Sequence, residues 1–448
     1  MQRHREPGRP GSGRGHRSPA RDGGPTALPR GRASARNGGV APCPPPTRGP
    51  RARRASPARG FWFAAVALTI SMAFGTAPAV LWPLYQARDG FGATTVTVAF
   101  AVLVVGAAFS FLTLGHLSDR LGRRRIIAAA LLVTIAAAIV LLCRPDVPGL
   151  VLGRVLNGIG VGLMASTATT YLHDLFRQAH PGRAASPTPG VVATLGNLGG
   201  LALGPLTAGV IAQWLPAPLT TTQVVFAVAL AISLVLVLSS PETVVAGGHR
   251  QDRPRRFALQ DGGGAAFVSG AGLGFFAFAL LGLVASLGAI MIRDVLGAGS
   301  PFVAGVVPFS MFASAAVAQL TIGRRAPDKM LTVGVVAFVA GLVLVSVSLR
   351  HPALWLFVIA VVVAGAGAGL LFSSGLTRST AAAVPASRAG VLAVYFVIAY
   401  AGMGGPSILF SIVLRYTGME TVMTAFAIAL AVGATLAVIG ATRAAHRT

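Results

Sequence analysis

The chain has 448 residues, of which 54% are hydrophobic and 11% charged, and its mean hydropathy is +0.72. Because a soluble domain usually carries about 25% charged residues, this composition excludes a soluble globular domain and favours a protein that lies in lipid. The two cysteines, Cys43 and Cys143, fit no metal-binding spacing, and we expect them on opposite sides of the membrane. No apolar signal segment precedes Phe61.

Residues 1–60 form an arginine-rich segment. They hold 14 arginines against Glu6 and Asp22, and so carry about half of the net charge of +25. A segment this rich in Arg, Gly, Pro and Ser cannot bury a core, so we expect a disordered cytoplasmic tail. It has no aromatic side chains on which bases could stack, which favours attraction to anionic lipid over binding of nucleic acid. The alternative is that the start codon is assigned too early.

Twelve apolar segments follow the tail, and each is long enough to cross a bilayer as a helix. They cover residues 61–84, 94–114, 126–143, 149–171, 189–212, 222–240, 265–289, 302–322, 331–349, 353–374, 390–413 and 421–441. The connection 241–264 is the longest of the connections. We therefore expect an all-α integral membrane fold with an N-terminal six-helix half, residues 61–240, a C-terminal half, residues 265–442, and a short cytoplasmic tail, residues 443–448.

The distribution of Lys and Arg predicts the orientation. Connections after even-numbered segments, with the C-terminal tail, hold 17 of these residues, whereas those after odd-numbered segments hold 5. Positive connections are retained in the cytoplasm, so both termini are expected there.

The two halves resemble copies of one six-helix unit. Gly158, Gly160 and Gly162 in the fourth segment are matched at an offset of 207 by a second glycine triplet, residues 365, 367 and 369. Two weaker echoes pair Gly115 with Gly323, and residues 204–205 with 405–406. Such a repeat predicts two pseudo-symmetric halves with a solute pathway between them.

The connection between the second and third segments carries the strongest motif in the chain. Its defining residues are Gly115, Leu117, Ser118, Asp119, Arg120, Gly122, Arg123 and Arg124. The pattern resembles the Gly-x-Leu-Ser-Asp-Arg-x-Gly-Arg-Arg loop of the major facilitator superfamily. This resemblance implies a twelve-helix transporter that works by alternating access.

The physical chemistry of this loop suits a gate. Gly115 lets its helix approach a neighbour closely, and Gly122 permits the turn. We expect Asp119 to face a helix N-terminus or arginines across the interface only when the cytoplasmic gate is shut, a contact worth about 0.3–2 kcal/mol. The alternative is that the arginines only set the topology.

The fourth segment resembles the second motif of the family, with Arg154, Asn157, Gly158 and Gly160, and with Asn where Gln is usual. A buried arginine costs a few kcal/mol, so Arg154 should face the bundle interior with a partner. The resemblance associates this arginine with proton transfer. The alternative is a span that starts later, with Arg154 extending to the outer surface.

The fifth segment resembles the third motif, which is typical of drug/proton antiporters, through Gly200, Gly204, Pro205 and Gly209. Ala208 replaces one glycine of that motif. A stack of glycines before a proline predicts close helix packing with a bend, suited to an outer hinge or seal. Generic packing of small residues is the alternative reading.

Polar and aromatic residues inside the segments are candidates for contact with a solute. They are Trp82, Tyr85, Asn197, Gln319, Tyr395 and Tyr400. The acidic residues after Phe61 all fall near segment ends or in connections, which favours a neutral or anionic, partly apolar cargo. Asp89, Asp174 and His173 are weak candidates for carrying a proton.

Together with these patterns, the family resemblance implies a monomeric bacterial transporter in the cytoplasmic membrane that exports a small lipophilic compound, coupled to proton entry, as drug-resistance efflux antiporters do. No metal or cofactor is expected, and no nucleic acid partner. No Ser/His/Asp set, zinc spacing or phosphate loop supports enzymatic chemistry. The alternatives are an uptake permease or uniporter of the same fold and, more distantly, a receptor or scaffold that does not transport.

Overall fold

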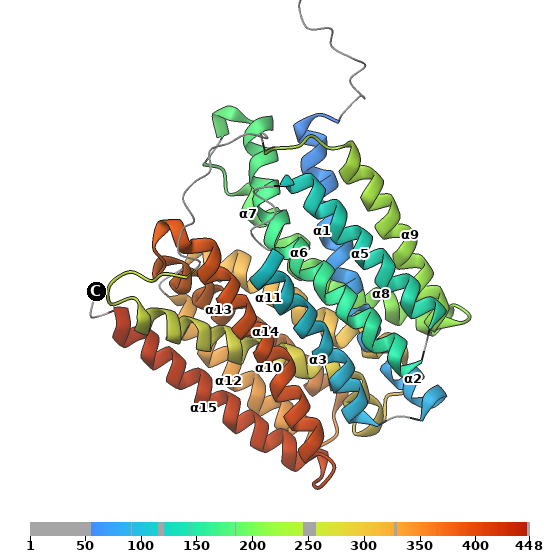
Figure 1. The fold of residues 1–448 in the computed structure, drawn as a ribbon. Coiled ribbons are helices and arrows are strands. Elements are labelled where there is room, and N and C mark those ends of the chain that lie inside the picture. Colours follow the sequence, from blue (N-terminus) through green and yellow to red (C-terminus); the bar gives the residue numbers. More distant parts are fainter. Residues whose placement is uncertain are drawn as a thin grey trace, which may run out of the picture. The chain divides into compact units, whose positions relative to one another are not determined.

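The computed structural model describes residues 55–90, 92–114, 121–144, 146–183, 185–244, 257–326 and 329–445. Within these ranges, twelve helices are long and apolar enough to cross a membrane, which confirms the predicted all-helical, twelve-span fold. Figure 1 shows the first six spans in blue to green and the last six in yellow to red.

The spans of the N-terminal half consist of α1 (Pro57–Thr76), η1 (Ala77–Leu81), α2 (Trp82–Asp89), α3 (Ala93–Phe109), η2 (Ser110–Leu114), α5 (Arg123–Cys143), α6 (Val147–Ala179), α7 (Thr188–Thr194), η5 (Leu195–Gly199), α8 (Gly200–Trp214) and α9 (Pro218–Ser239). Those of the C-terminal half consist of α10 (Gly264–Asp294), α11 (Pro301–Arg325), α12 (Met330–Arg350), α13 (Leu354–Ala381), η7 (Pro385–Ser387), α14 (Arg388–Val413) and α15 (Met419–Ala445). A short η4 (Pro181–Arg183) follows α6.

Three spans of the N-terminal half are not continuous α-helices. The 3-10 segment η1 interrupts the first span, and the π-helical turns η2 and η5 lie in the second and fifth. Such irregular turns inside helices occur frequently at functional sites. Hydropathy alone predicts none of them, because all three stretches are as apolar as their surroundings.

The helices extend beyond the apolar segments that predict them. The clearest case is α6, which continues to Ala179 and therefore carries Asp174 and Arg177 on its last turns. No glycine or proline interrupts this stretch before Pro181. The helix thus brings charged side chains to the end of the bundle as part of a rigid element.

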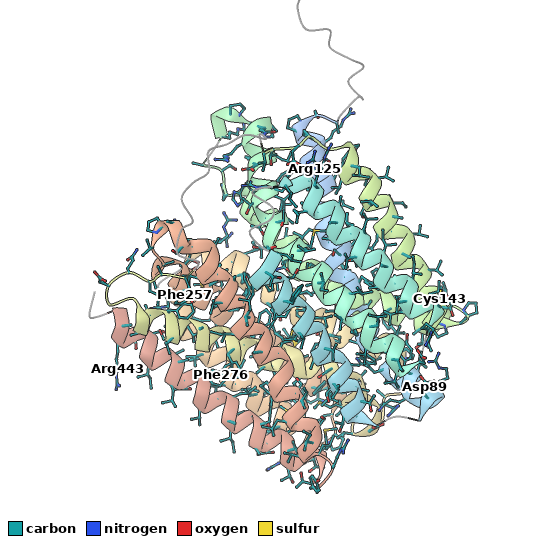
Figure 2. The ribbon with its side chains drawn as sticks, in the orientation of Figure 1. Asp89, Arg125, Cys143, Phe257, Phe276 and Arg443 are labelled. Atoms are coloured by element: carbon teal, nitrogen blue, oxygen red, sulfur yellow. The ribbon has the colours of Figure 1, made fainter. Side chains whose placement is uncertain are left out.

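The bundle has two ends with different charge. We call the end where α1 and α5 begin the Arg-rich end, because Arg123, Arg124, Arg177 and Arg324 lie at helix termini there. The other end, where α2 and α5 finish, is called the opposite end. Figure 2 shows labelled Arg125 and Cys143 at the two ends of α5.

Glycine triplets fix how helices cross inside each half. A Cβ on Gly158 would collide with the backbone of α3, and one on Gly160 with α5. In the second half, Gly365 and Gly369 press against α11, and Gly367 presses against α12. The two triplets therefore make the same pair of crossings, as expected for a duplicated six-helix unit.

The two Gly-Pro pairs, residues 204–205 and 405–406, do not make equivalent contacts. Gly204 lies against the backbone of α1 at Ala73, whereas no atom lies within 4 Å of a Cβ built on Gly405. The close approach of α14 to α10 occurs instead at Gly402, beside the Phe275 carbonyl. A proline lies inside both helices, but different glycines make the close contacts beside it.

The central connection is described only from Phe257 onward on its C-terminal side. Phe257 packs edge-on against Phe267 at a centroid distance of 5.3 Å, and the backbone N–H of Gln260 donates to Ala382 O at 2.9 Å. This end of the connection therefore packs on the C-terminal half.

The glycine crossings yield a stability prediction. Gly158→Ala and Gly365→Ala should each lower the free energy of unfolding by about 1–3 kcal/mol, because the added methyl group meets helix backbone. Gly405→Ala is the matched control, since its Cβ position is open. Thermal denaturation of the purified protein in detergent measures the effect. Equal melting temperatures for all three variants would contradict the packing described.

Candidate functional site

The charged loop expected to act as a gate is described from Leu121 onward. Five of its residues lie outside the described part of the chain: Gly115, Leu117, Ser118, Asp119 and Arg120. Gly122 has a φ of +99°, a conformation that favours glycine. A Cβ there would also lie 2.6 Å from Oε2 of Glu242, so the turn into α5 has no room for a side chain.

Glu242 caps the start of α5. Its Oε1 accepts hydrogen bonds from the backbone N–H groups of Arg123 at 2.9 Å and Arg124 at 3.4 Å. A carboxylate at a helix N-terminus satisfies unpaired amides and meets the positive end of the helix dipole. A residue that closely follows α9 therefore holds the charged loop. Sequence reasoning missed this role, although an acid directly after Pro241, ahead of an arginine-rich connection, was the available signal.

The loop arginines are tied to neighbouring helices of their own half. Arg123 forms an ion pair with Asp174 of α6, whose other oxygen accepts from Arg177 at 2.7 Å. Arg124 donates to the carbonyls of Leu238 at 3.3 Å and Ser240 at 3.1 Å, at the end of α9. The described part of the loop thus joins α5, α6 and α9 into one unit.

Arg154 is buried inside the N-terminal half, with 1% of its surface exposed. Its Nη1 donates to the Gly75 carbonyl at 3.1 Å, and its guanidinium lies 5.1 Å from the centroid of the Trp82 ring. The arginine therefore faces the bundle interior and does not extend to the surface. Asn157, one turn further along α6, is also fully buried.

The glycines of the fifth span face two different helices. Gly200 and Gly204 lie against α1, where added Cβ atoms would meet the backbone near Thr69 and Ala73. Gly209 faces the other half of the molecule, with its Cβ position 3.2 Å from the Cα of Gly305 in α11. The motif thus packs within its half and also forms a seam between halves.

Among the described residues, three hydrogen bonds join the halves near the opposite end. Thr97 and Ser411, both buried, pair their hydroxyls at 2.8 Å across α3 and α14. One turn outward, Arg415 Nε donates to Thr94 Oγ1 at 2.9 Å. On the α8–α11 side, Ser300 donates to Gln213 at 2.9 Å. Both helix pairs are therefore closed against each other at this end.

The predicted solute contacts fall into two groups. Trp82, Tyr85 and Tyr395 are fully buried, and the Tyr395 hydroxyl donates to the Phe372 carbonyl at 2.7 Å. The second group is partly exposed and comprises Asn197 in η5, Gln319 in α11 and Tyr400 in α14. Gln319 donates to the Gly369 carbonyl at 3.0 Å.

Aromatic rings bridge the halves around Tyr400. Phe111 of η2 stacks on Phe396 of α14 at 5.0 Å, with an interplanar angle of 10°. Tyr400 lies 5.6 Å from Phe111 and 5.5 Å from Phe278 of α10. Helices of both halves therefore meet at an aromatic surface that includes one phenol.

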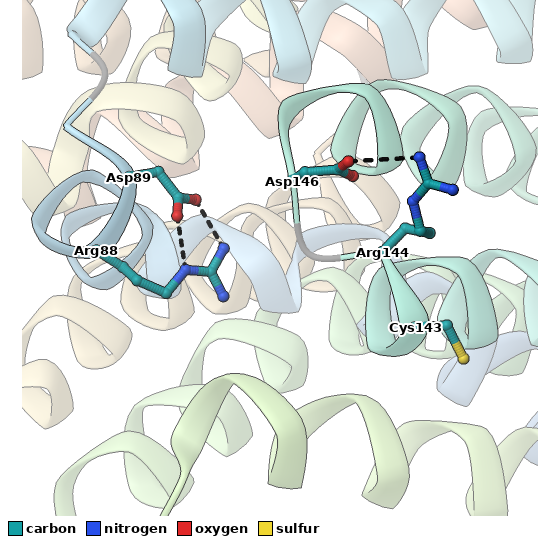
Figure 3. A pocket seen from close by; sticks show the side chains of 5 residues that line it. All are labelled: Arg88, Asp89, Cys143, Arg144 and Asp146. Carbon is teal, nitrogen blue, oxygen red and sulfur yellow. Dashed lines mark hydrogen bonds and ion pairs between the residues drawn. The ribbon is translucent and has the colours of Figure 1, made fainter.

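Two polar pockets lie at the ends of the bundle. One, of about 420 Å³, is at the opposite end and is lined by Arg88, Asp89, Cys143, Arg144 and Asp146. Figure 3 shows its two arginine–aspartate pairs, with the Cys143 thiol directed away from them. The other, of about 480 Å³, surrounds the Arg123–Asp174 pair. Among the described residues, no group of three His, Cys, Asp or Glu side chains could hold a metal ion.

Comparison with known proteins connects this architecture to a family. The family model described as Major Facilitator Superfamily matches residues 62–327. The arabinose-proton symporter of Bacillus subtilis (strain 168) is 39% identical over 71 residues, which cover 16% of this chain and 14% of the symporter. The glucose transporter GlcP of Staphylococcus epidermidis is 30% identical over 122 residues, which cover 27% of this chain and 24% of that protein. The chain thus matches less than a quarter of either relative's length.

A solved structure shares the fold. The nucleoside transporter NupG superposes with a TM-score of 0.67 at 14% sequence identity, over 85% of this chain and 99% of that chain. At this level of identity the similarity concerns the fold alone.

The Arg123–Asp174 pair yields a prediction about the loop. Asp174→Asn should lower the free energy of unfolding by about 1–3 kcal/mol, because the pair of Arg123 and Asp174, whose side chains are 15% and 13% exposed, is broken. The contact with Arg177, which is 63% exposed, adds little. Asp294→Asn is the control, since Asp294 is 47% exposed and its ion pair among the described residues is with its exposed neighbour Arg293. Melting temperatures in detergent, at low and high salt, provide the measurement. A control that melts as early as the test variant would argue against this role.

Proposed function

The chain belongs to the major facilitator superfamily, and from this premise we propose that it takes up a neutral, sugar-like solute by alternating access. It is a multi-pass membrane transporter with twelve spans and not an enzyme. Its substrate is a small molecule. The proposal concerns which solute is moved and in which direction.

The proposed orientation places the Arg-rich end in the cytoplasm. Arg123, Arg124, Arg177 and Arg324 lie there, at the ends of α5, α6 and α11. The end of a bundle with the excess of positive residues remains on the cytoplasmic side during insertion. Under this orientation the seams of α3 with α14 and of α8 with α11 close the outer end of the structure.

The aromatic surface around Tyr400 is the observation that carries the substrate class. The rings of Phe111, Phe278 and Phe396 gather around Tyr400 at the junction of the halves, and the Tyr400 hydroxyl adds a polar group. Small-molecule sites combine such apolar walls with a few polar groups that fix orientation. A sugar suits both features, because its C–H faces lie against rings and its hydroxyls form hydrogen bonds.

The direction of transport and the energy source rest on the relatives. Both matched proteins are named as sugar transporters, and one of them is named as a proton symporter. This supports uptake, and we propose proton coupling on the symporter's name alone. Export of a lipophilic compound is the second candidate, favoured by the glycine and proline motif of α8 and its contact with Gly305.

Transport by purified protein in liposomes tests the proposal. With an imposed proton gradient, labelled arabinose, glucose or xylose should accumulate inside, and an uncoupler should abolish the accumulation. Sugar uptake that equilibrates and ignores the uncoupler would retain the permease and remove the coupling. No uptake of any sugar, together with lower accumulation of lipophilic dyes in cells expressing the protein, would favour export.

The two tyrosines of α14 offer a matched pair of variants. Tyr400→Phe should raise KM by about two- to tenfold, because the solute loses one hydrogen bond, and should leave stability unchanged. Tyr395→Phe should leave KM unchanged and cost about 1 kcal/mol of stability, because its hydroxyl serves the Phe372 carbonyl. Initial uptake rates and melting temperatures separate the two roles. The opposite assignment of effects would place the site elsewhere.

A further inference from the structure

The first span is not a continuous α-helix. After α1 ends at Thr76, the chain passes through the 3-10 segment η1 before α2 begins at Trp82. Pro78 has no N–H, so it cannot donate to the Gly75 carbonyl in the i to i+3 pattern of this segment. In lipid, a carbonyl freed by such a break needs a donor from a neighbouring helix.

Arg154 of α6 contacts both sides of the interruption. Its Nη1 donates to the carbonyl of Gly75, the residue before the last of α1, and its guanidinium lies over the ring of Trp82, the first residue of α2. Nε and Nη2 have no hydrogen-bond partner among the described residues. Among the described residues, these two contacts across the break hold the buried guanidinium.

A second helix supports the same turn from the other side. The Thr76 hydroxyl donates to the Leu201 carbonyl of α8 at 2.9 Å, and Gly204 leaves room for the Thr76 side chain. The break therefore lies between α6 and α8 and is bonded to each.

The interrupted segment also touches the C-terminal half. η1 packs against α10 and α11 as well as against α8, and α2 packs against α10. Its position thus affects the fit between the halves near the opposite end, where the α8–α11 seam is closed. Whatever holds η1 in place stabilises that closure.

We infer that Arg154 is a positioning residue that holds the break in the first span against the C-terminal half and thereby favours closure of the opposite end. This inference rests on the proposed function, because closure of one end matters only to a transporter that alternates between inward-facing and outward-facing states. It requires only a cation that donates to the Gly75 carbonyl and lies over the Trp82 ring. An arginine suits this role because it does not release its proton in proteins.

The test compares three arginine variants in one reporter background. Cys43→Ser and Cys143→Ser remove the native thiols, and Ser411→Cys places a single thiol in the α3–α14 seam, where Ser411 is 1% exposed. Arg154→Met removes both contacts across the break. Arg154→Lys keeps a cation and a donor. Arg144→Met is the control, because Arg144 is 70% exposed at the same end of the bundle.

The readout is the rate at which a membrane-impermeant maleimide, added outside the cell, labels the single thiol introduced by Ser411→Cys. Arg154→Met should raise this rate by about five- to tenfold, because the closed state loses a charge-assisted hydrogen bond and a cation–π contact. Arg154→Lys should restore slow labelling, and Arg144→Met should label as slowly as the parent. The size-exclusion profile of each variant identifies folded protein, and labelling is scored only on that fraction.

Sugar counterflow measured on the same variants separates the possible failures. If the parent transports sugar and Arg154→Met labels as slowly as the parent, the positioning role is wrong while the proposed function stands. If Arg154→Met labels slowly and loses only proton-driven accumulation while counterflow persists, the arginine serves coupling and the inference is overturned. If the parent moves no sugar but Arg154→Met labels faster, the proposed substrate is wrong and the positioning role stands.

Discussion

Backbone-to-backbone contact through glycine is the constraint on which the rest of this structure depends. Helices that are apolar on every side gain little by turning one face toward another, so close packing must supply the specificity. At Gly158 and Gly365 a single methyl group would meet the carbonyl oxygens of the adjacent helix. These crossings fix the second and fourth spans, and the eighth and tenth, as pairs. The charged and aromatic groups are then held at set positions on those pairs.

The charged groups have different partners at the Arg-rich end and in the interior of the bundle. At the Arg-rich end, Glu242 accepts from backbone amides of α5, and Asp174 pairs with Arg123, while Arg124 donates to carbonyls at the end of α9. These contacts link three helices of one half. Inside the half, Arg154 has a carbonyl and a ring as partners. The first arrangement makes a rigid unit of the half, and the second ties that unit to the break in the first span.

Much of the fold could be predicted from the sequence, because span length, arginine bias and repeated glycines each have one physical meaning. The number of spans is confirmed, and the two glycine triplets make matching contacts. The site could be predicted only in part. Tyr395 and Tyr400 lie in the same apolar segment, and the sequence does not distinguish them. Tyr395 donates a hydrogen bond inside its half, whereas Tyr400 lies between the halves.

The reason is that a membrane helix carries no amphipathic stripe from which its faces could be read. Glu242 was missed for another reason, since its partners are backbone amides 118 and 119 residues away, which leave no mark in a local pattern. The breaks at η1, η2 and η5 were likewise not predicted, although Pro78 within η1 was a local signal. The gate residues Gly115 to Arg120 lie outside the described part of the chain, so their role stays a prediction.

The hydroxyl pair of Thr97 and Ser411 has a consequence for how easily the molecule can change state. Each hydroxyl also lies within reach of a carbonyl in its own helix, Thr94 O at 3.0 Å for Thr97 and Ile408 O at 2.8 Å for Ser411. When the halves separate, both protons have an acceptor waiting, so no buried donor is orphaned on the way. Separation of this pair therefore adds little to the free-energy difference between the two conformations, which the binding of a solute must shift.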